Sequence, residues 1–162
     1  MPLHPIDTQT VLFASATLDV ARPPREVEGV LREQPAGWLA SLIEEAWQAE
    51  RGLLRQLSPD GRGRFPLREE AEVHSATQLG EGLLIPLGWH SLSTEAIFPS
   101  AEMDLEATPL VESATGTRLE LRARLTTATA RAADSALVEA AQQYVCELTA
   151  RVSAHLLNHL AA

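Results

Sequence analysis

The chain has 162 residues, 45% hydrophobic and 22% charged, which is typical of a single soluble globular domain and argues against extensive disorder. All 13 basic residues are arginine, and the net charge of −9 disfavours nucleic acid and anionic membrane surfaces as partners. The only cysteine, Cys146, cannot form an intrachain disulfide. No apolar run approaches the ~20 residues of a membrane span. The first residues also lack the features of a secretory signal, so we expect a cytoplasmic protein without stable membrane insertion.

The first half of the chain predicts one strand followed by two helices. Residues 1–9 are polar and contain proline, and we expect them to be flexible within a single domain of residues 1–162. Alternation over Thr10–Val20 predicts a strand. Pro24 suits the first turn of a short helix. Apolar residues at helical spacing then predict a longer helix over Ala36–Leu57, before a turn.

The second half predicts a run of antiparallel strands. Side-chain polarity alternates over Glu72–Leu79 and Leu83–Trp89, and the glycine-rich residues between them suit a hairpin connection. It alternates again over Glu102–Leu110, with acidic residues outward, and over Arg118–Leu125, with arginines outward. If these two strands pair antiparallel, acids meet arginines across the ladder and help to set its register. A turn is expected between them, at Glu112–Gly116.

One long helix ends the chain. Asp134 is a suitable N-cap, and apolar residues mark one broad face from Leu137 to Leu160. The helix would be about 40 Å long at 1.5 Å per residue. Strands that cluster together, without alternating with helices, predict an α+β fold. We therefore expect a curved antiparallel sheet wrapped around a long C-terminal helix, with two helices after the first strand.

Several short motifs, together with the order of elements from Thr10 to Leu160, resemble a known family. The motifs are Ile85-Pro86-Leu87-Gly88-Trp89, Phe98-Pro99, Met103-Asp104-Leu105-Glu106, Thr117-Arg118-Leu119 and Asp134. The chain resembles the helix-grip fold of the START-like (SRPBCC) superfamily, close to uncharacterised bacterial members similar to polyketide cyclases and lipid-transfer proteins. It departs from their pattern at Ser135, where arginine is common, and at Thr126–Thr129, where tyrosine and proline are expected. The resemblance implies a cavity between sheet and terminal helix but no catalytic residue.

Three functions are compatible with such a cavity. The one we favour is binding, transport or sequestration of a hydrophobic small molecule, with no catalytic residue, cofactor or metal. The residues expected to line the cavity are Leu87, Trp89, Met103, Leu105, Leu121, Tyr144, Val145 and Leu148. The second is a cyclase- or dehydratase-type enzyme acting on a polyketide-like substrate, which needs an acid–base pair in the cavity, such as His74 or His90 with a carboxylate. The third is a structural or interaction protein whose own side chains fill the cavity. The sequence does not indicate an oligomeric state.

Reactive side chains elsewhere have simpler explanations. Strand parity directs His90 away from the face that carries Trp89, so we expect it to face solvent. His155 and His159 are neighbours on a helix and could hold a metal, but no third ligand is apparent. Cys146 lies in mid-helix, where we expect an ordinary packing or surface residue.

Two larger groups of side chains have alternative interpretations. The row Glu102, Asp104 and Glu106 could bind a metal, but the facing arginines favour a solvated ion-pair surface. The large aromatic residues could line a pocket for a planar or lipid-like ligand, or they could fill the core. These aromatic residues are Trp38, Trp47, Trp89, Phe98 and Tyr144.

Overall fold

The computed structural model describes residues 9–49, 69–91, 98, 100–128 and 135–161. In chain order the elements are β1 (Gln9–Val20), α1 (Pro24–Arg32), α2 (Pro35–Ala49), β2 (Glu69–Val73), β3 (Thr77–Leu79), β4 (Gly82–Ser91), β5 (Ser100–Leu110), β6 (Ser113–Ala128) and α4 (Ser135–Leu160). The predictions for residues 1–8, for the helix beyond Ala49 and the turn after it, and for the cap at Asp134 lie outside the described residues.

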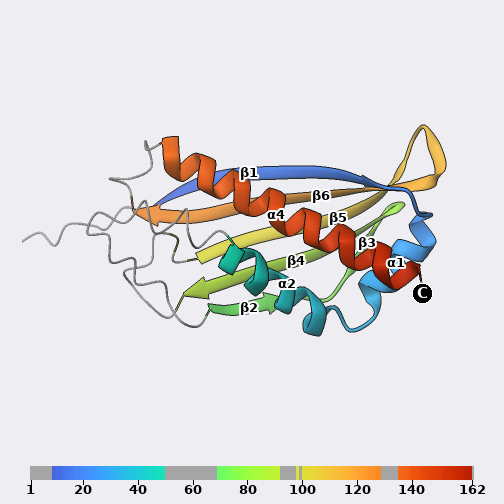
Figure 1. Ribbon diagram of the computed structural model, residues 1–162, viewed down its shortest axis with the longest axis horizontal. Helices are drawn as coiled ribbons and strands as arrows, with labels where there is room; N and C mark the ends of the chain where they lie inside the picture. Colours follow the sequence, from blue (N-terminus) through green and yellow to red (C-terminus); the bar gives the residue numbers. More distant parts are fainter. Residues whose placement is uncertain (1–8, 50–68, 92–97, 99, 129–134, 162) are drawn as a thin grey trace, which may run out of the picture.

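The strands form one antiparallel sheet in the order β1-β6-β5-β4-β2, with β3 also paired to β4. In Figure 1 the long helix α4 crosses one face of this sheet, α2 lies beside it over β4 and β2, and α1 lies at one end. The predicted α+β helix-grip arrangement is therefore confirmed. Within the described ranges, no helix combines the length and apolar character needed to cross a membrane.

The helices bury the apolar stripes that predicted them. Pro24 occupies the first turn of α1, and Val27, Val30 and Leu31 on its inner face are buried. The inner face of α2 buries Leu39, Ile43, Ala46 and Trp47. The longest stripe is that of α4, and its buried apolar residues are Leu137, Ala140, Ala141, Tyr144, Val145, Leu148, Val152 and Leu156. These stripes and the inner face of the sheet form one hydrophobic core.

The strand predicted over Glu72–Leu79 is interrupted. Val73 pairs with Leu87, whereas Thr77 pairs with Leu84, so the register on β4 shifts by one residue between β2 and β3. A shift of one residue exchanges the two faces of a strand. Leu79, predicted to share a face with Val73, is consequently about half exposed.

The β5–β6 hairpin is longer than predicted. Its turn lies at Val111–Glu112, and β6 already begins at Ser113, inside the predicted turn of Glu112–Gly116. At the other end, β6 continues to Ala128 because Thr127 and Ala128 still pair with β1. The strand therefore extends past Leu125, where the predicted alternation ends, into the threonine-rich segment.

The outer face of the sheet is an ion-pair surface, as predicted. Glu102 lies opposite Arg124 and accepts a hydrogen bond from it. Glu106, however, lies opposite Glu120, and the guanidinium of Arg122 bridges the two acids at 2.6 and 3.5 Å. Because these side chains are largely exposed, they set register more than they stabilise the fold.

Candidate functional site

All eight residues predicted to line a cavity are buried on the concave side of the sheet. The sheet contributes Leu87 and Trp89 from β4, Met103 and Leu105 from β5, and Leu121 from β6. Helix α4 contributes Tyr144, Val145 and Leu148, and none of the eight is more than 3% exposed. Sheet and helix therefore present apolar side chains to one shared interior.

Aromatic rings converge at one end of this interior. The ring of Trp47, from α2, lies 4.8 Å from that of Trp89 and 5.5 Å from that of Tyr144. Phe98 makes an edge contact with Trp47 at 6.4 Å, and Trp89 makes one with Tyr144 at the same distance. Three separate elements thus build one aromatic wall, with the tilted and edge-on geometry that ring quadrupoles favour.

Alanine side chains lie between larger apolar ones on the concave sheet face beside this wall. In the ladder row of Trp89, Ala71 on β2 and Ala101 on β5 flank the indole. In the next row Ala123 of β6 pairs with Ala14 of β1 on one side and with Met103 on the other. Alanine side chains project only a short distance from the sheet, so the aromatic rings lie beside positions where the inner layer is thin.

Four buried threonine and serine side chains lie in the described core, and their hydrogen bonding differs. Thr117 donates to the backbone oxygen of Arg22 at 2.8 Å, and Thr149 donates to that of Val145 at 2.7 Å. For Thr127 Oγ1, and likewise for Trp89 Nε1, no described residue provides a hydrogen-bond partner, although both residues are buried. Thr127 extends the inward parity of Leu119 to Leu125 on β6.

No Asp, Glu, His or Arg side chain is buried among the described residues. His90 lies on the outer face, as its parity predicts, with Nε2 3.2 Å from Glu70 and Nδ1 3.6 Å from Glu72. His74 is exposed and 3.8 Å from Glu72. The histidines considered for an acid–base pair therefore do not point into the interior.

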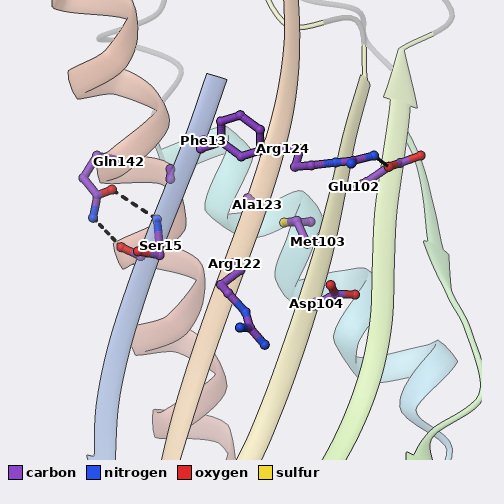
Figure 2. A pocket seen from close by; sticks show the side chains of 10 residues that line it. Phe13, Ser15, Glu102, Met103, Asp104, Arg122, Ala123, Arg124 and Gln142 are labelled. Carbon is purple, nitrogen blue, oxygen red and sulfur yellow. Dashed lines mark hydrogen bonds and ion pairs between the residues drawn. The ribbon is translucent and has the colours of Figure 1, made fainter. Parts of the chain in front are cut away.

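An open groove of about 860 Å³ lies on the opposite, outer face of the sheet. Figure 2 shows Phe13, Arg122 and Arg124 projecting into it, with α2 behind the strands. Its lining includes the charged residues Glu102, Asp104, Arg122 and Arg124, and Phe13 is 73% exposed. The groove is open to solvent along the pleated outer face of the sheet.

Helix α4 also covers part of the sheet edge formed by β1. The side chain of Gln142 donates to the backbone oxygen of Ser15 at 2.6 Å and accepts from its nitrogen at 3.3 Å. The amide thereby imitates a neighbouring strand on the edge strand β1 (Figure 2). Unpaired edges favour association with other chains, and this contact blocks part of one.

The paired histidines of α4 take part in a stack. The ring of His155 lies parallel to Trp38 of α2, with centroids 4.3 Å apart, and His159 follows at 6.1 Å. Partial burial, and secondarily the charge of His159, lower the pKa of His155 from its usual 6.5. No cluster of three metal-ligating side chains occurs in the described part of the chain. Cys146 is an exposed free thiol.

Three residues of this interior were not in the predicted lining. Trp47 lies on the apolar stripe of the helix predicted over Ala36–Leu57, but only the tertiary packing brings it against Trp89. Phe98 was considered only as one of the large aromatics. Thr127 lies beyond Leu125, where the predicted alternation ends, yet the two-residue alternation of β6 extends to it and places it inward.

No protein-family model matches the chain, and no curated protein matches it. Among solved structures, it is similar to Ara h 8.0201, at 9% identity and a TM-score of 0.43, with 92% of this chain and 99% of that chain covered. A START superfamily protein from Mycobacterium smegmatis has 11% identity and a TM-score of 0.45, with 91% and 98% covered. The ZhuI aromatase/cyclase from Streptomyces sp. R1128 has 16% identity and a TM-score of 0.33, with 92% and 90% covered. Identities and TM-scores at this level assign neither a family nor an activity to the chain.

Proposed function

We propose that the protein binds a hydrophobic small molecule between the concave face of the sheet and helices α2 and α4. The observation that carries the proposal is the aromatic wall of Trp47, Trp89, Phe98 and Tyr144, which faces the apolar inner surface of the sheet. Ligand pockets in proteins are lined predominantly by hydrophobic and aromatic side chains, which is the composition of this interior.

Apolar burial would drive the binding. Each square ångström of apolar surface removed from water contributes about 25 cal/mol, before the cost of ordering the guest. The described interior has no charged group to orient a polar substrate or to exchange a proton with it. The composition of the site therefore supports binding and not acid–base catalysis.

Native mass spectrometry of the purified protein tests the proposal. We expect a native mass above that of the chain alone, with the excess mass disappearing under denaturing conditions. After the bound molecule is extracted and the protein is refolded, we expect the protein to take up an apolar probe such as tetralin. Ala101→Leu should weaken this uptake, because Ala101 is 3% exposed and beside Trp89 on the inner face.

Glu102→Leu is the matched control, because Glu102 follows Ala101 in β5 but points to the outer face and is exposed. It should leave tetralin uptake unchanged. A bare chain mass together with no uptake of apolar probes, or equal effects of the two substitutions, would overturn the proposal.

A further inference from the structure

Buried hydrogen-bonding groups in native proteins nearly always have partners. The rule holds for Thr117 and Thr149, each of which bonds a backbone oxygen within 3 Å. Within the described part of the chain it fails for the indole Nε1 of Trp89 and the hydroxyl of Thr127, whose residues are 2% and 0% exposed. Two exceptions in one core need an explanation specific to their location.

Both groups lie at the same end of the concave face. Trp89 pairs across the sheet with Ala101, which pairs in turn with Leu125 of β6. Thr127 is the next inward residue of β6 after Leu125, one row further along. The two polar groups thus lie at the end of the interior where the aromatic wall is built.

The chemistry of these two polar groups specifies which hydrogen-bond partners they would accept. An indole N–H only donates a hydrogen bond, whereas a threonine hydroxyl can donate or accept. A molecule that satisfies both must therefore present an acceptor to Trp89. A pure hydrocarbon would leave the indole donor buried without a partner, which disfavours its binding.

We propose that the bound molecule is an apolar compound carrying a hydrogen-bond acceptor, such as a ketone or ester carbonyl, which accepts from Trp89 Nε1 with Thr127 as a second polar contact. This inference rests on the proposed function and adds the chemical class of the ligand. Trp89 fixes the position of the acceptor, and the apolar wall holds the remainder of the molecule.

A matched pair of probes tests the inference. Tetralin and 1-tetralone share a bicyclic skeleton and differ by one carbonyl group, so their affinities can be compared by calorimetry on the refolded protein. A net hydrogen bond corresponds to roughly 3- to 10-fold in affinity, and we expect 1-tetralone to bind more tightly by that factor.

Variants then assign the preference to particular atoms. Trp89→Phe removes the donor, and the ratio of the two affinities should fall to about one or below, whatever happens to the absolute affinities. Thr127→Val keeps the side-chain shape without the hydroxyl and should reduce the ratio by about twofold, while Thr127→Ser should preserve it. The threonine variants keep the test decisive if Trp89→Phe does not fold.

The outcomes separate the two proposals. If neither probe binds, the proposed function fails. If both bind with equal affinity to the unmodified protein, the function stands and the inference about the acceptor is overturned, because the carbonyl then contributes nothing to binding. A preference for 1-tetralone that survives both Trp89→Phe and Thr127→Val also overturns it.

Discussion

Truncation of Leu148 tests whether α4 covers the sheet as described. Leu148 is 0% exposed, near the middle of the 26-residue helix. Leu148→Ala removes three carbons, which at about 0.8 kcal/mol each amounts to about 2.4 kcal/mol of lost transfer free energy. The cavity left behind raises the total loss in unfolding free energy to about 3–5 kcal/mol.

Leu157→Ala on the same helix is the matched control. Leu157 is 40% exposed, so water can fill the vacated space and the expected cost is about 1 kcal/mol. Urea unfolding followed by circular dichroism measures both variants. With a slope of about 1–3 kcal/mol per molar urea, the midpoint for Leu148→Ala should lie lower by about 1–5 M. Equal losses for the two variants would refute the packing of α4 against the sheet.

Three further predictions concern the surface and the helix ends. Because the pKa of His155 is lowered in the folded state, protonation favours unfolding, and the free energy of unfolding should be level above pH 6.5 and fall as the pH drops below it. In urea titrations, His155→Gln should flatten this fall between pH 7 and 5. An unchanged slope would contradict the assignment. Gln142→Ala removes the hydrogen bonds to Ser15 and should speed hydrogen exchange at the Ser15 amide by about fivefold. Gln143→Ala is the control. Unaltered protection of the Ser15 amide would show that Gln142 does not cover the β1 edge. Arg122→Ala should lower the free energy of unfolding by less than about 1 kcal/mol, and by less still in high salt, because the ion pairs of Arg122 with Glu106 and Glu120 are exposed. A decrease of several kcal/mol would be inconsistent with a solvated surface.

Periodicity predicted the faces of most elements correctly. Alternation on β4 placed Leu87 and Trp89 inside and His90 outside, because a paired strand has only two faces and one of them is buried. Helical spacing likewise placed Tyr144 and Leu148 on the buried face of α4. Such patterns are set by local geometry, so the sequence is sufficient to identify them.

The failures occur where a distant contact decides the outcome. The register shift between Val73 and Thr77 depends on how both segments pair with β4, and the alternation of their side chains gives no sign of it. Thr127 is strand because β1 still pairs with it at that point. That its hydroxyl has no described partner, unlike that of Thr149, follows from tertiary surroundings that no single segment specifies.

The most direct test of binding between sheet and helices is a proton–nitrogen NMR titration with 1-tetralone. The account predicts that the indole resonance of Trp89, identified by its loss in Trp89→Phe, shifts on titration and shows contacts to the ketone protons. Substitution of Phe13 in the outer groove by alanine should not alter these shifts. Shifts confined to residues of the outer groove, with an unmoved Trp89 indole, would contradict it.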